Sequence, residues 1–289
     1  MTTNLAASQL DNQPINARLT RAARGPLPPT IFWRIREEIP GPLSLLLMVL
    51  SAITPFLLWW AVTYVGNVNP VFLPSPGDVG QAFVRLWERG FLTQDIAASF
   101  LRVSGGFALA AVVALPVGIV MGSFASIRAL FEPLIGILRY MPAPAFIPLF
   151  ILYMGIDEAP KITLIFVGTV FYNILMIMDA AKFVPKDLIE TTYTLGGRRY
   201  QALLQVITPY ILPNIIDTFR INIAASWNLV VVAELVAAEV GLGKRILIAQ
   251  KFLNTDEIFA NLIMLGVIGF ALDLLFRLLQ RLLCKWAVT

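Results

Sequence analysis

Histidine is absent from this 289-residue sequence, and cysteine occurs once, at Cys284. A single cysteine excludes a disulfide framework within the chain, and together these absences exclude the usual metal sites built from His and Cys. The commonest general base of enzymes is missing too, so we expect no catalytic residue, although carboxylates could still act as bases. Charged residues are also scarce, at 14% of the sequence, whereas soluble domains contain about 25%.

Apolar residues are what the chain has in excess. They make up 58% of the sequence, and the mean hydropathy is +0.77, whereas soluble domains are roughly 45–50% apolar. This composition predicts an all-α polytopic membrane protein. The net charge of +4 comes from basic residues gathered in a few loops, which indicates membrane orientation rather than binding of nucleic acid.

Six apolar segments are each long enough for the roughly 20 residues that a bilayer crossing requires. The third is interrupted by Pro142, Pro144 and Pro148, each of which removes a backbone donor. A segment over residues 1–43 precedes the spans on the cytoplasmic or interfacial side, and residues 31–39 within it could form a helix on the bilayer surface. The expected transmembrane domain covers 44–285, with spans at about 44–65, 100–123, 130–155, 160–178, 214–238 and 259–283.

The distribution of Lys and Arg predicts the orientation of these spans. With a cytoplasmic N-terminus, the cytoplasmic segments hold more Lys and Arg than the outer segments, as the positive-inside rule requires. The cluster of Lys244, Arg245 and Lys251 after span five is the exception. Both termini are therefore expected in the cytoplasm, and so is the polar loop 181–213 between spans four and five.

Two features of the spans predict helix packing. Span two carries small residues at every fourth position, a spacing that lets helix backbones approach closely in lipid. These are Gly106, Ala110, Ala114, Gly118 and Gly122. In span five, we expect Glu234 to accept hydrogen bonds from backbone amides of the turn 241–243 rather than to contact a substrate.

The proline-rich part of span three holds the first candidate for a substrate path. A charge at membrane depth is costly and usually faces a cavity or a partner, so Arg139, with Met141 and Pro142, could line a pore that meets an anion. Alternatively, Arg139 pairs with a carboxylate such as Glu132 or reaches an interface. Amide and indole groups that could add donors to the same path are Asn173, Trp227 and Asn228.

The polar loop 181–213 has its own pattern of helix starts and stops. Pro185 and Asp187 are typical of a helix start, and the pair Gly196-Gly197 can end that helix by supplying positive φ. A second helix is expected over 198–208, ended by Pro209. The loop is thus predicted to be a short helix–turn–helix; an ordinary solvated loop is the alternative.

The loop also carries a family pattern. Glu190, Gly196 and Pro209 resemble the "EAA" loop of ABC-importer permeases, which reads E-A-A, three residues, G, nine residues, I-x-L-P. Thr191 and Thr192 stand where that pattern has alanines. The stretches LPSP at 73–76 and WNLVVVAELVAAEVGLG at 227–243, and the arginine–proline stretch of span three, are similar to the nitrate/sulfonate/bicarbonate (taurine-like) branch of this family.

This resemblance implies a type I ABC-importer permease (MetI-like) fold in the bacterial plasma (inner) membrane. It implies a dimer with a second permease copy, cytoplasmic ATP-binding subunits, and an extracytoplasmic substrate-binding protein. ATP and Mg²⁺ would lie on the partner ATPase, and this chain would bind no cofactor or metal. The residues that the resemblance places in ATPase coupling are Asp187, Glu190, Thr191, Thr192, Gly196, Gly197, Arg198 and Pro209.

The expected function is therefore import of a small anion of the nitrate, bicarbonate or sulfonate type by alternating access, driven by ATP on another subunit. The alternative is a secondary transporter or channel for small anions that needs no ATPase. Intramembrane acid–base relays, which many ion-coupled carriers use, are poorly represented here. The sequence Gly241-Leu242-Gly243-Lys244 lacks the remaining residues of a phosphate-binding loop, so no nucleotide is expected to bind by that route.

Overall fold

The computed structural model describes residues 39–66 and 68–287, and every regular element within them is helical. Nearly all of the expected surface helix over 31–39 lies outside the described residues. The chain divides into two compact units, Met1–Ala61 and Val62–Thr289. Most of helix α3 (Gly41–Tyr64) belongs to the first unit, and this helix contains no charged residue.

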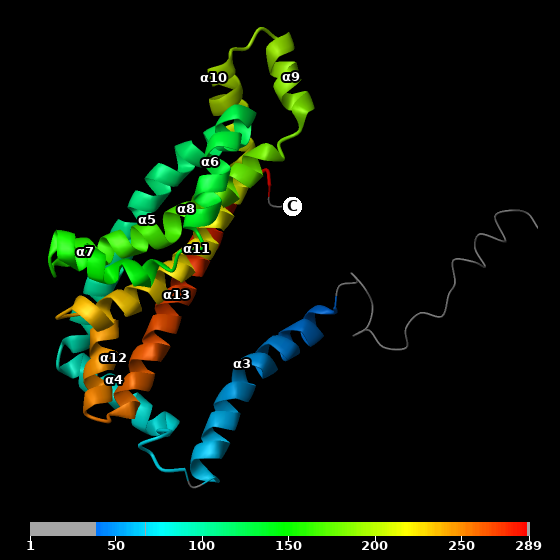
Figure 1. Ribbon diagram of the computed structural model, residues 1–289. Helices are drawn as coiled ribbons and strands as arrows, with labels where there is room; N and C mark the ends of the chain where they lie inside the picture. The colour runs from blue at the N-terminus through cyan, green and yellow to red at the C-terminus, as the bar shows by residue number, and fades with distance from the viewer. Residues whose placement is uncertain (1–38, 67, 288–289) are drawn as a thin grey trace, which may run out of the picture. The chain divides into compact units, whose positions relative to one another are not determined.

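Four long helices dominate the second unit, and α11 packs against each of the other three. They are α5 (Phe91–Ser123), α8 (Glu158–Lys182), α11 (Thr208–Ala237) and α13 (Thr255–Leu283). Helices α9 and α10 lie at one end of this unit, and α4 and α12 lie at the other (Figure 1). The shorter elements are α4 (Pro76–Glu88), α6 (Ala125–Leu138), the 3-10 turn η2 (Ala143–Phe146), α7 (Ile147–Met154), α9 (Lys186–Thr194), α10 (Arg199–Gln201), the π-helical segment η3 (Ala202–Ile207) and α12 (Leu242–Lys251).

Among the described residues, five helices are long and apolar enough to cross a membrane: α3, α5, α8, α13, and the continuous helix over 199–236 that contains most of α11. Helix α6 and the segment 143–154 pass the same test together, but they are bent by 79°. The third expected span, 130–155, is therefore not a straight helix. Prolines at 142, 144 and 148 account for the break, because each lacks the amide that a continuing helix requires.

The prediction that Pro209 ends a helix is wrong. Pro209 lies inside the continuous helix over 199–236, directly after the π-helical segment η3, and a local π-helical adjustment of this kind lets a helix tolerate a proline. The preceding Thr208 donates its hydroxyl to the carbonyl oxygen of Leu203 (2.8 Å), which satisfies an acceptor within the π-helical segment. The loop helix thus continues into α11 before the expected start of span five at 214. Likewise α5 begins at Phe91, earlier than the expected start at 100, and Asp95 in this first part is buried and paired with Arg245 (2.7 Å).

The expected contact face of small residues is confirmed, and its partner is α8. A Cβ added to Gly106 would lie 2.7 Å from the carbonyl oxygen of Ile162, and one added to Gly118 would lie 2.9 Å from that of Ile174. Ala110 and Ala114 between them are fully buried. The backbones of α5 and α8 therefore touch along several turns.

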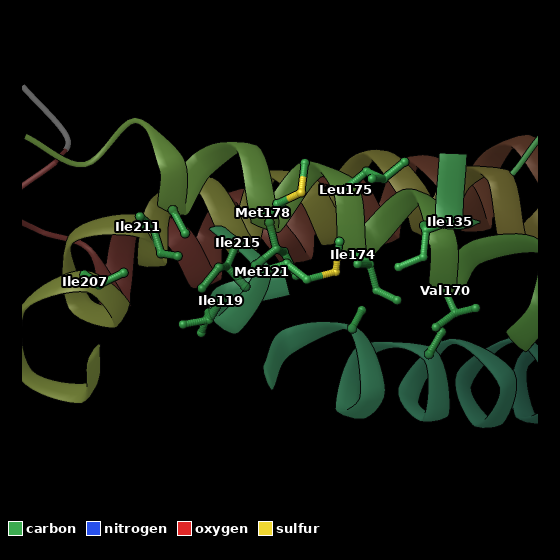
Figure 2. Close-up of a cluster of buried hydrophobic side chains, with 14 of the residues drawn as sticks. Ile119, Met121, Ile135, Val170, Ile174, Leu175, Met178, Ile207, Ile211 and Ile215 are labelled. Atoms are coloured by element: carbon green, nitrogen blue, oxygen red, sulfur yellow. The ribbon is translucent and has the colours of Figure 1, made fainter. Parts of the chain in front are cut away.

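A core of buried apolar side chains fills the junction of α5, α8 and α11, toward the end that carries α9 (Figure 2). Met121 comes from α5, Ile174 and Met178 come from α8, and Ile211 and Ile215 come from α11. All five side chains are less than a tenth exposed. Close packing of this kind resists small changes in volume, so the three helices form one body at this end.

Two adjacent glycines test the α5–α8 contact. Gly106→Ala places a methyl group against the α8 backbone, and we expect it to destabilise the protein by about 1–3 kcal/mol, the usual cost of overpacking. Gly105→Ala is the matched control, since its Cβ would lie 3.9 Å from the nearest atom of Ile162. Thermal unfolding of the purified protein in detergent measures both. A Gly106→Ala variant as stable as Gly105→Ala would contradict this packing.

Candidate functional site

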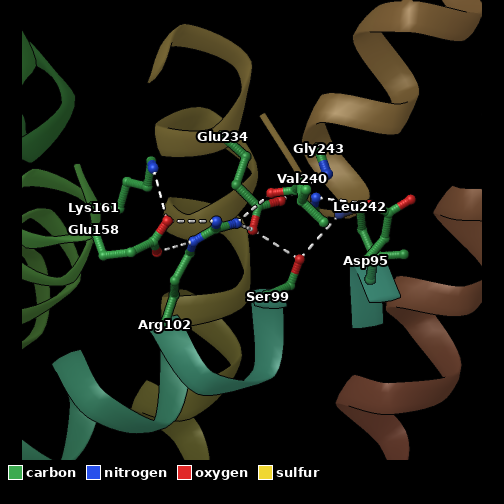
Figure 3. A network of polar contacts seen from close by, with 10 residues as sticks. Asp95, Ser99, Arg102, Glu158, Lys161, Glu234, Val240, Leu242 and Gly243 are labelled. Atoms are coloured by element: carbon green, nitrogen blue, oxygen red, sulfur yellow. Dashed lines mark hydrogen bonds and ion pairs between the residues drawn. The ribbon is translucent and has the colours of Figure 1, made fainter. Parts of the chain in front are cut away.

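A network of charged side chains joins α5, α8 and α11 near the end that carries α12 (Figure 3). Arg102 donates to Glu158 through Nε (2.5 Å) and Nη2 (2.8 Å), and to Glu234 through Nη1 (2.7 Å). Its Nη1 also donates to the carbonyl oxygen of Val240 (2.6 Å), and Lys161 donates to Glu158 (3.0 Å). The side chains of Arg102 and Glu234 are 6% and 0% exposed, so these charges are buried but paired.

The same network fixes the turn between α11 and α12. Glu234 accepts hydrogen bonds from the hydroxyl of Ser99 (2.7 Å) and the backbone amide of Gly243 (2.8 Å). Its expected role as an acceptor for this turn is therefore confirmed. Asp95 accepts from the amide of Gly241 (2.8 Å), so the turn is held by α5 as well as by α11. Sequence reasoning assigned no role to Arg102, although a cation within an apolar helix signals a buried partner.

Helix α9 lies in the loop between α8 and α11, and two glycines end it. Gly196 adopts φ +80°, and its amide donates to the carbonyl oxygen of Tyr193 (2.9 Å), while the amide of Gly197 donates to that of Thr192 (2.8 Å). This pair of bonds is a Schellman motif, in which glycine supplies the left-handed residue. The predicted helix stop is confirmed. Helix α9 contains no buried residue and projects from the end of the unit (Figure 1).

The two threonines that replace alanines of the family pattern do not present free hydroxyl donors. Thr191 donates to the carbonyl oxygen of Asp187 (2.7 Å), and Thr192 donates to that of Leu188 (2.8 Å). Both hydroxyls are therefore satisfied within α9 itself. Most of the candidate coupling residues are exposed at this end: Asp187, Glu190, Thr191, Gly196, Arg198 and Pro209, with Thr192 and Gly197 partly buried.

A cavity of about 610 Å³ lies between the bend that follows α6 and the middle parts of α8 and α11. It brings together four of the candidate path residues, which are Arg139, Met141, Pro142 and Asn228. We call it the central cavity. Among the described residues that line it, none is Asp or Glu, so the only formal charge in its wall is the guanidinium group.

Arg139 has no carboxylate partner in the described part of the chain, so the alternative pairing with Glu132 is not formed. Its Nη2 donates to the hydroxyl of Tyr140 (2.9 Å), and its guanidinium carbon lies 4.8 Å from the centroid of that ring. Its Nε is buried, and no described residue accepts a hydrogen bond from it. This leaves one N–H donor unsatisfied beside the cavity.

The other two candidates, Asn173 and Trp227, do not line the central cavity. Asn173 is fully buried and accepts a hydrogen bond from the amide of Asn222 (2.7 Å). Asn222 does line the cavity, yet it was not among the candidates. The sequence feature that could have indicated Asn222 is an amide side chain within an apolar helix, because a buried amide needs a polar neighbour. The Nδ2 of Asn173 and the Nε1 of Trp227 are buried without an acceptor among the described residues.

Comparison with known proteins gives the family of this fold and site. Residues 114–287 match the family described as binding-protein-dependent transport system inner membrane component. A probable ABC transporter permease protein of Brucella melitensis is 37% identical, over 79% of this chain and 92% of its own length. The taurine transport system permease protein TauC of Escherichia coli is 32% identical, over 88% of this chain and 92% of its own. A putative aliphatic sulfonates transport permease protein of Bacillus subtilis, SsuC, is 34% identical, over 79% and 83%.

Solved structures show a similar fold. An inward-facing conformation of the MetNI methionine ABC transporter has a chain that superposes with a TM-score of 0.61 at 18% sequence identity. The match covers 68% of this chain and 97% of that one. The helical arrangement of this chain is thus similar to that of a chain of this transporter.

The chain belongs to the family of binding-protein-dependent transport system inner membrane components. It is a multi-pass inner-membrane permease subunit of an ABC importer, and ATP hydrolysis lies in a separate subunit.

The ionic network can be tested by neutralising one buried carboxylate. Glu234→Gln replaces one of the two acceptor oxygens of Glu234 by an amide nitrogen, so one of the buried donors around it loses its acceptor, while Arg102 keeps its two hydrogen bonds to Glu158. We expect it to destabilise the protein by about 1–3 kcal/mol, the usual cost of a buried polar group left unsatisfied. Glu239→Gln is the control, because Glu239 is an exposed carboxylate close by. Thermal unfolding in detergent compares them. Equal stability of the two variants would show that the network does not hold these helices together.

Proposed function

We propose that this permease subunit carries a small anion of the nitrate, bicarbonate or sulfonate type through the central cavity. The observation that carries the proposal is the guanidinium of Arg139, which has neither a carboxylate partner nor an acceptor for its buried Nε among the described residues, in a cavity wall without carboxylates. A buried N–H group without an acceptor is costly, and an anion with several oxygen atoms would supply acceptors. The relatives named for taurine and aliphatic sulfonates support the same class of substrate.

Other side chains complete this proposed path. Met141, Pro142 and Asn228 form part of the cavity wall. Asn173 and Trp227 stand behind it, each with a buried N–H group that has no acceptor in the described residues. We assign them to the path as donors that become available when the helices move.

The proposed assembly contains more than this chain. An extracytoplasmic binding protein delivers the anion, in keeping with the family description. Cytoplasmic ATP-binding subunits hold ATP and Mg²⁺, and the chain itself binds no cofactor. A second copy of the same permease completes the translocation path as a homodimer.

The proposed topology has six crossings, with the bent pair of α6 and α7 counted as one, and both termini in the cytoplasm. The excess of Lys and Arg on one side supports it. In this orientation α9 faces the cytoplasm, while α4 and α12 face the outside. The transmembrane domain over 44–285 then carries the coupling loop 181–213 on its cytoplasmic side.

In this assembly α9 is the helix that contacts the ATPase. It is exposed, it ends in a Schellman motif, and it follows α8 closely and leads through α10 and η3 into α11. A rigid element that joins two helices can transmit a rigid-body motion to both. Glu190 lies exposed in the middle of α9, where it can pair with a cation of the partner.

Charge reversal on α9 tests the coupling role. Glu190→Lys is expected to abolish transport-coupled ATP hydrolysis by the assembled complex in proteoliposomes, because it places a cation where the ATPase would meet a carboxylate. Glu88→Lys makes the same charge change at an exposed position of α4, at the other end of the unit, and it should leave hydrolysis intact. Normal coupling in Glu190→Lys would refute docking through this face of α9.

Neutralising Arg139 tests the anion path. A hydrogen bond to a charged group contributes about 1.5–3 kcal/mol, so Arg139→Gln should lower the initial rate of anion uptake at limiting substrate by about 10- to 100-fold. Arg128→Gln, on α6, which ends directly before Arg139, is the control, because Arg128 lies outside the cavity lining. Uptake of labelled anion into proteoliposomes that contain the ATPase measures both. Equal uptake by the two variants would remove Arg139 from the path.

A further inference from the structure

Three cavities follow one another along the contact between α8 and α11. The distal cavity, of about 830 Å³, lies toward α12, and the proximal cavity, of about 590 Å³, lies toward α9, with the central cavity between them. On and beside α8, residues within 156–161 line the distal cavity, residues within 167–172 line the central cavity, and residues within 176–183 line the proximal cavity. On and beside α11, the corresponding ranges are 236–240, 222–229 and 210–221. The order reverses on α11, so the two helices are antiparallel and the cavities form a row.

An apolar cluster separates the distal cavity from the central cavity. Ile147, Leu164 and Ala233 pack together with exposed fractions of 7%, 0% and 2%, and they come from α7, α8 and α11 respectively. Leu164 lies between the α8 residues that line the two cavities, and Ala233 holds the same place on α11. A contact of apolar side chains excludes water and ions, because an ion cannot be desolvated there without a partner.

The barrier on the other side of the central cavity has a different chemistry. Asn222 lines the central cavity and Met176 lines the proximal one. The amide nitrogen of Asn222 lies 2.7 Å from the side-chain oxygen of Asn173 and 3.4 Å from the sulfur of Met176. Amide groups at this barrier can exchange their hydrogen bonds with water or an anion. The apolar cluster toward α12 is therefore the tighter of the two barriers.

The short helix α7 contributes Ile147, the member of this trio that lies outside the long helices. It joins α6 through the 79° bend and leads to α8 through Gly155, whose φ is +80°. Leu164 and Ala233, by contrast, belong to long helices tied together by the ionic network and the core. Phe146 and Phe150 stack with ring centroids 5.9 Å apart, which stiffens η2 and α7 as one piece.

We propose that η2 and α7 form the outer gate of the translocation path. Contact of Ile147 with Leu164 and Ala233 closes the central cavity toward the outside, and movement of α7 away from α8 and α11 opens it. The inference rests on the proposed topology and is independent of which anion is carried. It assigns to the proline-rich break in the third span a mechanical role in addition to its placement of Arg139.

Engineered cysteines can test the gate, because the single native cysteine, Cys284, is fully buried. Ala225→Cys reports on the central cavity and Ala159→Cys on the distal cavity. The full complex with its ATPase, in vesicles without ATP, is treated from the extracytoplasmic side with a membrane-impermeant thiol reagent. We expect the distal cysteine to react and the central one to react at least tenfold more slowly.

Opening the cluster should remove that difference. Leu164→Ala is expected to raise the labelling rate of Ala225→Cys at least tenfold, while Ile177→Ala, an equally buried change on the same helix outside the cluster, should not. Ala233→Ser adds a hydroxyl group to the cluster and leaves no cavity there, and it should also raise the labelling rate of Ala225→Cys. Rapid labelling of Ala225→Cys behind the intact cluster, or no acceleration by either cluster variant, would overturn the gate.

The labelling experiment also separates the gate from the other proposals. Reaction of Ala159→Cys only from the cytoplasmic side would overturn the topology, and with it the placement of the gate on the outside. No substrate is present, so a failure of the anion assignment would leave the labelling pattern unchanged.

Discussion

The pairing of Arg102 with Glu158 and Glu234 is the interaction on which the arrangement of the long helices depends. Charged side chains within apolar helices persist only where other groups of the protein satisfy them. Here one guanidinium joins α5, α8 and the end of α11, and Glu234 extends the same network to the turn that begins α12. Loss of Arg102 would leave the buried carboxylate of Glu234 without its cation.

Close packing joins the same helices toward the opposite end of the unit. The glycines of α5 bring its backbone against α8, and the apolar core then joins both helices to α11 (Figure 2). The long helices are therefore joined to one another by charge pairs and by packing, whereas η2 and α7 contact α8 and α11 through an apolar cluster that includes Ile147, Leu164 and Leu229. This division places the movable barrier beside the row of cavities, and the rigid connection to α9 at the far end.

Local rules predicted much of this arrangement from the sequence. The four-residue spacing of small residues gave the α5 contact face, the glycine pair gave the end of α9, and Glu234 was correctly assigned to the turn at 241–243. Arg102 was missed because its partners lie 56 and 132 positions away in the chain, and no local pattern joins them. Two further features were beyond prediction. The direction of the chain after Pro142 depends on tertiary packing, and the passage of the helix through Pro209 depends on a π-helical segment.

The most direct test is uptake of a labelled anion by proteoliposomes that contain this permease. We propose that a path along α8 and α11 opens only when a separate ATPase acts through α9. Uptake should then require the ATPase subunits, ATP and the binding protein together, and omission of any one should abolish it. Anion entry at an undiminished rate without the ATPase would contradict the account and indicate a transporter that works alone.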